Sequence, residues 1–477
     1  MKKNYYTLLI LLMGFISSSY AQLSIEGEFR PRAIVENGFK IPALKNDDHR
    51  LSFDQRSRII FKYSSEKYST KLSLQDARIW GSDDMVNKTG PEANSYGLGV
   101  YEAWVDLKLT VKSGLKIGRQ EWNYDDMRIL SPRNFWTSGQ SYDGLLYHFS
   151  EVDKKLKIDF GFSYNNNGSP MGIVVDNTEW ESDKLKSMSF VHINKVFSPK
   201  FNASLMFTLA GKTDVSNDAV LGTGTHGINL SYNRGKGADN GLFAMASAYY
   251  QHGTDMKRGS DGAYKSISAY LLTAQVGLRT NDKKLELSAG MELISGHDYS
   301  ETDEDYNNTR HSFDLLQSAR VPYYGGYMNH FIIQDSYLVG TKGGGYFDPY
   351  VKAKYIINKK NSLETAFYLP SLTTKVAAHT GINPDTNKPM GAEVDGNGNQ
   401  VYWKGGLGHY LDILYTHKAS KEIILKAGLS YGQISDIKNQ MAHGYEDAAS
   451  KTLHELDPNY FGWVMLIVKP QFFSSSK

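Results

Sequence analysis

Hydrophobic and polar residues alternate along much of this chain, in stretches of about ten to fourteen residues. Clear cases place the following side chains on one face: Leu156, Ile158, Phe160 and Phe162; Phe201, Leu205 and Leu209; Leu285, Leu287 and Leu293; Ile423, Leu425 and Leu429. The residues between them are polar or small. The pattern predicts strands with one face toward an apolar phase and the other toward a lumen rather than a packed core.

The connections between these strands sort by length. Short links lie at 64–67, 110–113, 151–154, 198–200, 235–240, 281–283, 358–360 and 419–421. Long polar segments lie at 37–50, 80–97, 123–140, 167–185, 212–223, 254–265, 297–345, 374–402 and 436–457. Tight turns at one rim and open loops at the other are typical of an antiparallel up-and-down β-barrel in a bacterial outer membrane, with short periplasmic turns and long extracellular loops.

Counting by this rule gives an all-β transmembrane barrel of about eighteen strands, and sixteen would also satisfy the even number that such barrels need. Segments 186–197 and 241–253 alternate poorly, and 458–470 is apolar on both faces, as a closing strand would be. The barrel domain is expected over 22–473, followed by a short tail, 474–477. A secreted soluble sandwich or propeller is the alternative, but it does not explain the sorted loop lengths.

The N-terminus has the form of a secretory signal, expected over 1–21. Lys2 and Lys3 are followed by an apolar run, 8–16, and by a small-x-small cleavage pattern at 19–21. The run is too short to span a bilayer as a helix. Only about two residues would then precede the first strand, which leaves no room for the plug domain of an energy-coupled receptor. The expected location is therefore the bacterial outer membrane.

Composition agrees with a barrel. The chain of 477 residues has 32 Tyr, as two interfacial girdles require, and no Cys, which excludes disulfides and thiolate metal sites. The mean hydropathy of −0.44 is no objection, because only every second strand residue would face lipid. A net charge of +2 says little about partners. Membrane lipid and lipopolysaccharide are the expected surroundings, and no nucleic acid, metal or cofactor is expected.

Several catalytic or metal-binding patterns fail on context. The Gly-x-Ser-x-Gly match at 428–432 lies inside an alternating strand, where no helix follows the serine. The Gly-x-Gly-x-x-Gly match at 222–227 is interpreted as a glycine-rich loop before another strand. Segment 395–399 resembles a calcium loop but lacks its closing Glu, so a plain turn is favoured. The acidic run 301–305 is read as a solvated loop, with divalent cation binding left open.

Cations concentrate on one face of the N-terminal strands. Those expected to point into the lumen are Arg30, Arg32, Arg56, Arg58, Lys62 and Lys71. On the lipid face, each would cost roughly 2–4 kcal/mol near the midplane, whereas rings of Arg and Lys in a pore favour anions. Carboxylates of matching parity leave open a balanced salt-bridge lattice instead of a net cationic constriction; these are Glu26, Glu28, Glu102 and Asp106.

Five short motifs resemble the alginate export family of outer-membrane porins. They are 76–81 (DARIWG), 118–121 (GRQE), 124–130 (YDDMRIL), 134–136 (NFW) and 141–144 (SYDG). The resemblance implies a monomeric barrel of eighteen strands with an arginine-lined constriction for an anionic polysaccharide. The positions it carries over are Arg78, Arg119, Arg128, Asp126 and Asp143. The chain departs from the family pattern at Asp125 and in an insertion at 131–133, which adds Arg133.

Segment 123–140 is expected to be the constriction loop, since it mixes Asp, Arg and Trp between two strands. Its guanidinium groups can pair with carboxylates while Trp136 or Trp122 stacks on a sugar face. Alternatively, the same residues only brace the loop, through Asp126 with Arg128 and Asp143 with Arg119. The expected function is a passive, non-enzymatic channel for anionic oligosaccharides or small anions. The alternatives are a general diffusion porin and an outer-membrane adhesin or enzyme barrel, although His148, His409 and His417 form no catalytic pattern.

Overall fold

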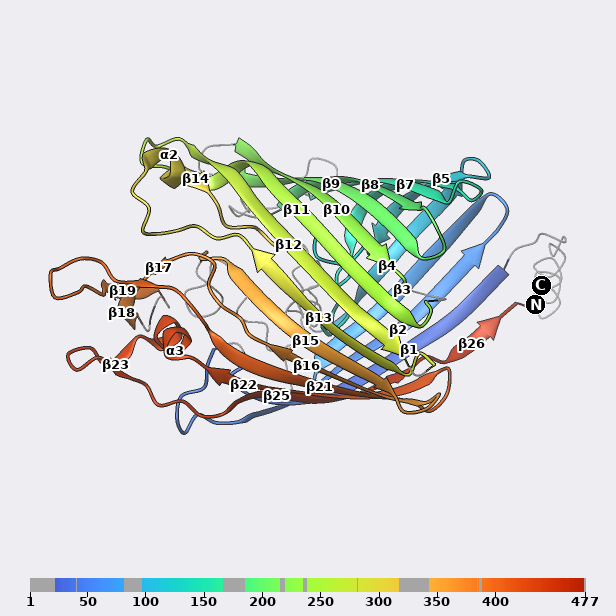
Figure 1. Cartoon of the computed structure of the whole chain (residues 1–477). Coiled ribbons are helices and arrows are strands. Elements are labelled where there is room, and N and C mark those ends of the chain that lie inside the picture. The colour runs from blue at the N-terminus through green and yellow to red at the C-terminus, as the bar shows by residue number, and fades with distance from the viewer. Residues whose placement is uncertain are drawn as a thin grey trace, which may run out of the picture.

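The fold is a closed antiparallel barrel of eighteen strands, which confirms the predicted fold class. The computed structural model describes residues 22–39, 41–80, 97–165, 185–214, 219–234, 238–280, 282–316, 343–383, 385 and 388–475. Segment 1–21, the expected signal, lies outside this part of the chain, as does most of the expected loops 80–97 and 167–185. Figure 1 shows the barrel from the side, with the turn end at the right and the loop end at the left.

Neighbouring strands in the wall are neighbours in the sequence. In chain order they are β1 Gln22–Asn37, β2 Arg50–Ser64, β3 Tyr68–Ile79, β4 Gly97–Lys108, β5 Ser113–Gln120, β6 Tyr142–Glu151, β7 Leu156–Tyr164, β8 Leu185–Val196, β9 Phe201–Asp214, β10 Ala219–Tyr232, β11 Gly241–Arg258, β12 Tyr264–Thr280, β13 Leu285–Ile294, β15 Tyr346–Ile356, β16 Asn361–Tyr368, β21 Gly408–Lys418, β22 Ile423–Ile434 and β25 Asn459–Val468 with its continuation β26 Gln471–Ser474.

Strand β25 closes the barrel, as its apolar pattern suggested. It pairs with β22 on one side and with β1 on the other, where Phe29 lies opposite Val468. Pro470, which cannot donate to the ladder, interrupts the strand, and β26 then continues the pairing with β1 as far as Ser474. Closure leaves no unpaired edge, which is the condition for strands to cross a membrane.

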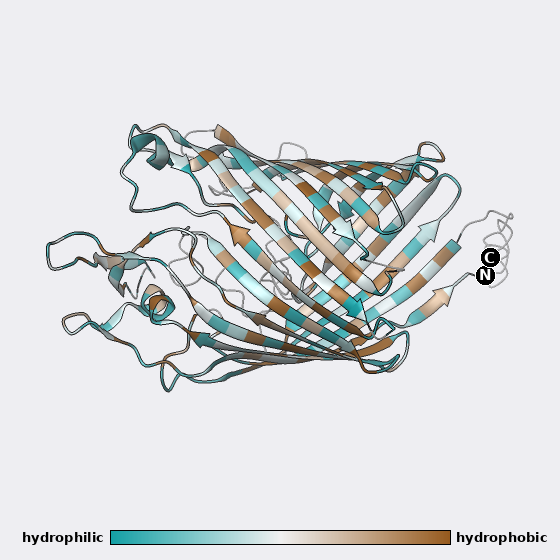
Figure 2. Ribbon diagram, viewed as in Figure 1, coloured by the Kyte–Doolittle hydropathy of each residue, from teal (hydrophilic) through white to brown (hydrophobic). Residues whose placement is uncertain are grey.

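Apolar side chains cover the outside of the wall. On β2, Leu51 is 67 % exposed and Ile59 is 48 % exposed, while Arg56 between them is buried in the lumen. Figure 2 shows the resulting alternation of brown and teal bands along the strands. Contact with the hydrocarbon of a membrane is favourable for such an apolar belt, whereas its exposure to water would cost free energy. Neither described helix is long and apolar enough to cross a membrane.

The loop lengths sort as predicted, with two exceptions. Segments 212–223 and 254–265 are mostly strand, because β9 and β10 extend to Asp214 and Ala219, and β11 and β12 extend to Arg258 and Tyr264. The motif at 222–227 is therefore part of β10, and its interpretation as a loop was wrong. These segments are polar and were therefore predicted to be loops. Strands that extend beyond the lipid need no apolar face, so polar residues do not exclude a strand there.

Three loops pack together at the loop end. Residues 38–49 (loop 1), 369–407 (loop 8) and 435–458 (loop 9) carry the two-strand ribbons β17–β20, β18–β19 and β23–β24 and the helix α3 Asp436–His443. Ribbon residues are Val376–Ala377 with Tyr402–Trp403, His379–Ile382 with Pro389–Ala392, and Tyr445–Asp447 with Thr452–Leu453. The turn at 395–399 closes on itself, since Asp395 Oδ1 accepts hydrogen bonds from the amides of Asn397 and Asn399.

Two further loops fold into the barrel. They are residues 121–141 (loop 3, between β5 and β6) and the described residues between β13 and β15, 295–316 and 343–345 (loop 7). Loop 7 includes the short elements α2 Glu304–Asn307 and β14 Thr309–Arg310. Both loops contribute buried apolar residues, among them Trp122, Leu130 and Phe313. These join lumen-facing residues of the wall, such as Leu271, in one hydrophobic cluster. The sequence pattern predicted an inner face of polar or small residues toward a lumen rather than a packed core, but part of the lumen holds a packed apolar cluster, because loops from distant parts of the sequence supply apolar partners.

Candidate functional site

Four arginines of the first two strands lie side by side on the lumen face. The register of β1 and β2 places Arg30 opposite Arg56, with Arg32 one step of the alternation toward the loop end and Arg58 one step toward the turn end. All four are at most 8 % exposed. We call them the arginine cluster. Alternation alone brings them together, since residues two apart on paired antiparallel strands share one face.

Two carboxylates neutralise part of this charge. Asp54 accepts from Nε of Arg32 at 3.2 Å, and Glu28 accepts from Nε of Arg56 at 2.7 Å. Arg58 instead donates to the amide oxygen of Gln75 at 2.7 Å. Its guanidinium carbon also lies 3.5 Å from the ring centroid of Tyr101, a cation–π contact.

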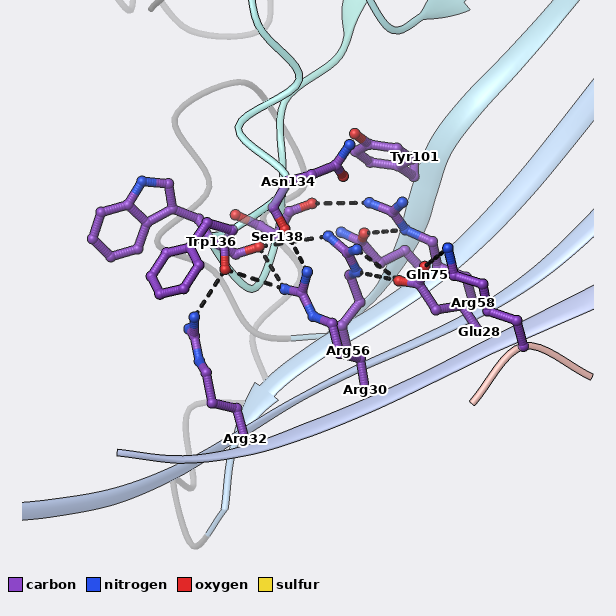
Figure 3. Close-up of polar contacts among 12 residues, drawn as sticks. Glu28, Arg30, Arg32, Arg56, Arg58, Gln75, Tyr101, Asn134, Trp136 and Ser138 are labelled. Carbon is purple, nitrogen blue, oxygen red and sulfur yellow. Dashed lines mark hydrogen bonds and ion pairs between the residues drawn. The ribbon is translucent and has the colours of Figure 1, made fainter. Parts of the chain in front are cut away.

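The rest of the hydrogen-bonding capacity goes to the backbone of loop 3, as Figure 3 shows. Arg30 donates to the carbonyl oxygens of Asn134 and, at 2.7 Å, Trp136, and Arg32 donates to that of Phe135 at 2.9 Å. Longer contacts of 3.5 Å join Arg56 to Trp136 O and Arg58 to Ser138 O. Neutral carbonyls satisfy the guanidinium donors without cancelling their charge.

The arginine cluster therefore keeps a net positive charge. Four guanidinium groups face the carboxylates of Glu28 and Asp54, which leaves a formal excess of two positive charges. Nearer the turn end, Lys62 pairs with Glu26 at 2.6 Å and Lys71 pairs with Glu102, so those lysines are balanced. The two layers of this wall thus differ: arginines outnumber carboxylates in the arginine cluster, whereas each lysine nearer the turns has a carboxylate partner.

The first half of loop 3 is bound to the opposite wall. Asp125 accepts hydrogen bonds from Ser204 at 2.6 Å and pairs with His192 at 2.9 Å. Asp126 accepts from Ser247 at 2.6 Å and from Tyr249 at 2.9 Å. Asp125 has φ 48°, a left-handed conformation that aspartate tolerates better than most residues. Loop 3 thus bridges the lumen from β8–β11 to β1–β2.

Arg128 locks this half of the loop in place. Its Nη1 lies 3.0 Å from Asp126 Oδ2, and its Nη2 pairs with Glu292 of β13. This distance confirms the predicted pairing of Asp126 with Arg128, and both side chains are almost fully buried. The pKa of Tyr124, in the same stretch, is raised by burial and by the charge of Asp159, so its hydroxyl stays a donor to that carboxylate at 3.0 Å.

Acidic and tyrosine side chains line the lumen face of β15 and β21, further round the wall from the arginine cluster. Asp348 accepts from Tyr346 at 2.5 Å, and Asp412 accepts from Ser430. The serine of the Gly-x-Ser-x-Gly pattern is thus a fully buried strand residue with an aspartate partner. Lys352 lies 4.2 Å from the ring centroid of Tyr350. This part of the wall thus carries Glu292, Asp348 and Asp412 together with Lys352 and the side chain of Arg128.

Three of the predicted residues lie outside the lumen. Arg78 pairs with Asp76 on the outward face of β3, with Nε 2.7 Å from Oδ2. Arg119 and Asp143 pair across β5 and β6 on the outward face, with Nε 2.9 Å from Oδ1. The placement of these residues on the solute path was wrong, because strand parity directs them away from the arginine cluster, although their expected bracing pair is present.

The remaining two predicted residues lie in loop 3. The Arg133 side chain reaches the carbonyl of Leu316 in loop 7 at 3.5 Å, so it connects the two inward loops. The Trp136 ring is half-buried, 6.4 Å from the ring of Phe39 in centroid distance, while its carbonyl serves the arginines. Trp136 is thus placed beside the cationic wall, as expected of a stacking residue.

Sequence reasoning missed several members of the site. Asp54 lies two residues before Arg56 on β2, so alternation alone would have predicted its side chain on the lumen face. Gln75 and Tyr101 carry no charge and gave no signal. Glu292 is separated from its partner Arg128 by 164 positions, and a single sequence does not show such a contact.

Comparisons with known proteins agree with this geometry. A family model described as alginate export matches residues 21–311. Solved structures with the same fold include OccAB1 of Acinetobacter baumannii (12 % identity, TM-score 0.57, covering 96 % of this chain and 99 % of that one) and the outer membrane protein OprD of Pseudomonas aeruginosa (11 %, 0.57, 96 % and 96 %).

A third, OccK11 of Pseudomonas aeruginosa, is 12 % identical, with a TM-score of 0.56 and coverage of 95 % of this chain and 96 % of that one. No curated protein sequence matches the chain. The barrel, its lipid-facing belt and the matched family place the protein in the bacterial outer membrane as a porin-type channel. The chain belongs to the alginate export family.

Proposed function

We propose that this protein is a monomeric, passive channel for anionic oligosaccharides or small anions. The observation that carries the proposal is the arginine cluster, whose four guanidinium groups face only two carboxylates where loop 3 meets the wall. Cationic rings at a constriction favour anions. Membership in a family described as alginate export, and so in a family named for an anionic polysaccharide, supports the same class of solute.

The hydrogen bonds of the cluster suit transient binding. Each arginine already bonds a carbonyl of loop 3, and a passing carboxylate offers the same acceptor geometry with a full negative charge. Exchanging one acceptor for the other keeps the donors satisfied throughout, so neither state leaves a buried donor unpaired. Conduction needs binding of this kind, favourable enough to admit the ion and weak enough to release it.

Carboxylates further round the wall have other partners. Glu292 pairs with Arg128, Asp348 accepts a hydrogen bond from Tyr346, and Asp412 accepts one from Ser430. Trp136, beside the cluster, supplies an apolar ring for the face of a sugar. A passive path of this kind follows the concentration gradient, and no residue of the cluster sets a direction.

Purified protein in planar bilayers tests the proposal. Arg58→Glu places a negative charge in the cluster, and Arg30→Gln removes a positive charge whose hydrogen bonds to loop 3 go to neutral carbonyl oxygens. Both substitutions should shift the reversal potential in a salt gradient toward cation selectivity. Arg78→Gln is the matched control, because it removes an arginine from the outward face and should leave the reversal potential unchanged.

A general diffusion pore is the second candidate. The observation in its favour is that the arginines of the cluster are already bonded to loop 3, as residues with a purely structural role would be. Oligouronates added to one side distinguish the two. Concentration-dependent block of the current that is lost in Arg30→Gln supports a saccharide path, and equal current with neutral and acidic oligosaccharides would leave only the general pore.

A further inference from the structure

Two histidines form a pair on the outer surface of the barrel, away from the lumen. His226 of β10 and His252 of β11 have their Nε2 atoms 2.6 Å apart. Their ring planes are inclined by only 22°, with centroids 4.7 Å apart, and the two rings meet through their Nε2 edges. Both side chains are exposed on the outward face. Two imidazole nitrogens thus lie next to each other at the surface.

Glycine makes room for this pair. A Cβ at position 224, in place of Gly224, would lie 2.5 Å from Nε2 of His252, closer than side chains tolerate. The ring of Phe207 meets that of His226 edge to face at 5.4 Å, and Tyr250 stacks beside His252 at 6.5 Å. Gly224 and Gly227 of the 222–227 motif therefore leave space for the neighbouring rings of His252 and Tyr249.

The pair lies at the outer boundary of the lipid-facing belt. Leu242, near the turn end of β11, is 64 % exposed, and ten residues of strand separate it from His252. At about 3.3 Å per residue and a tilt of about 45°, that distance corresponds to roughly 23 Å of depth, close to the about 25 Å of an apolar band. The exposed tyrosines 250 and 270 flank the pair, as in an interfacial girdle.

We propose that His226 and His252 bind one divalent transition-metal ion, Zn²⁺, Ni²⁺ or Cu²⁺, at the outer surface of the membrane. Imidazole nitrogen suits these ions, whereas Ca²⁺ and Mg²⁺ require oxygen ligands. Bonds of about 2.0–2.1 Å at a tetrahedral angle put two nitrogens roughly 3.3 Å apart, so a small rotation of either ring is enough to admit the ion.

The protein supplies two of the ligands. Over the described ranges of the chain, no group of three or more His, Cys, Asp and Glu side chains is placed to hold a metal. Water or a phosphate oxygen of the surrounding lipopolysaccharide completes the coordination, and both are abundant at the level of the headgroups. The site is open to solvent, so the ion exchanges freely and needs no change in the barrel wall.

Untagged protein in detergent provides the test, with the metal alone as the ligand. The wild type should be retained on immobilised Ni²⁺ and should bind Zn²⁺ in calorimetry with one ion per chain. His226→Asn and His252→Asn should each weaken Zn²⁺ binding at least about tenfold, because each removes one of two chelating ligands. Gly224→Val should weaken it as well, although it removes no ligand.

His49→Ala is the matched control, because it removes an exposed histidine that pairs with Tyr460 instead of another imidazole. Its Zn²⁺ affinity should equal that of the wild type. Failure of the wild type to bind Zn²⁺, or equal binding by the His226→Asn and His252→Asn variants, overturns the proposal. The channel measurements are independent of this result, since neither histidine faces the lumen.

Discussion

Individual residues in this barrel take their roles from strand parity. Arg119 and Arg128 belong to neighbouring motifs and both pair with an aspartate, but Arg119 faces outward at the rim and Arg128 is buried between loop 3 and β13. The energetic consequences of the two pairs differ accordingly. An exposed ion pair contributes little, whereas breaking a buried pair leaves an uncompensated charge in a medium that solvates it poorly.

Arg128→Met should therefore be strongly destabilising. It leaves the carboxylates of Asp126 and Glu292 close together without their cation, at a cost of about 3–5 kcal/mol. Arg119→Met, the matched control, should change stability by about 1 kcal/mol or less. Denaturant unfolding of the reconstituted barrel measures both, and equal losses for the two variants would contradict this account of loop 3.

The elements outside the wall depend on local capping as well as on packing. Helix α3 begins at Ser435, whose Oγ accepts from the amide of Lys438 at 3.2 Å, and it ends at Gly444, which has φ 80°. Gln440 joins the helix to loop 8, since its Oε1 accepts from Trp403 Nε1 at 2.8 Å. Loops 8 and 9 thus form one ordered layer over the loop end of the barrel.

The stability of this layer should rise with pH. Burial lowers the pKa of Lys438 to about 7, from a usual value of 10.5. Between these values the unfolded segment binds a proton that the folded one does not, so stability increases from about pH 7 to about pH 10. Limited proteolysis of loop 9 should slow on going from pH 7 to pH 9, and Lys438→Met should abolish the difference. An unchanged pH dependence in that variant would assign it to other groups.

At the scale of the whole molecule, residues of two inward loops pack against the lumen face of the wall. Segment 313–316 of loop 7 is held by Gln251 of β11, which donates to the carbonyl of Asp314 and accepts from its amide, both at 2.8 Å. The carboxylate of Asp314 pairs with Lys212 at 3.0 Å. This contact places Phe313 in the same buried cluster as Trp122 of loop 3.

Removing this attachment should increase conductance. Asp314→Ala loses a charge-assisted contact worth about 1.5–3 kcal/mol, and loop 7 should leave the lumen more often. Burial alone would raise the pKa of Asp314, but Lys212 and Arg310 outweigh it and lower the pKa to about 2. The contribution of the carboxylate to closure is therefore complete above about pH 4 and is lost only as the pH falls through about 2.

Single-channel recordings check both statements. Asp314→Ala should show a larger or more frequent open level than the wild type, and wild-type conductance should not rise between pH 7 and pH 5 through this residue. A wild-type increase over that range that persists in Asp314→Ala would point to other groups in the lumen.

Strand number, closure and the lumen position of the arginine cluster were predictable because they depend on alternation and loop length, which are local properties. Positions such as Arg78 and Arg119 were misplaced because the family resemblance was followed where parity pointed outward. The packing of loops 3 and 7 was out of reach, since Gln251 and Asp314 meet across 63 positions of sequence and neither residue has a distinctive pattern around it.

The pairing of β1 with β25 and β26 also governs how such a wall is assembled. Leu23 bonds Ser475 across 452 positions, so the first strand has no permanent neighbour on one side until the last has been synthesised. Its ladder groups and apolar face are a hazard for aggregation during that interval. The barrel can therefore close in the bilayer only after the whole chain has been made. Until then, the unfolded polypeptide must be protected from aggregation along its entire length.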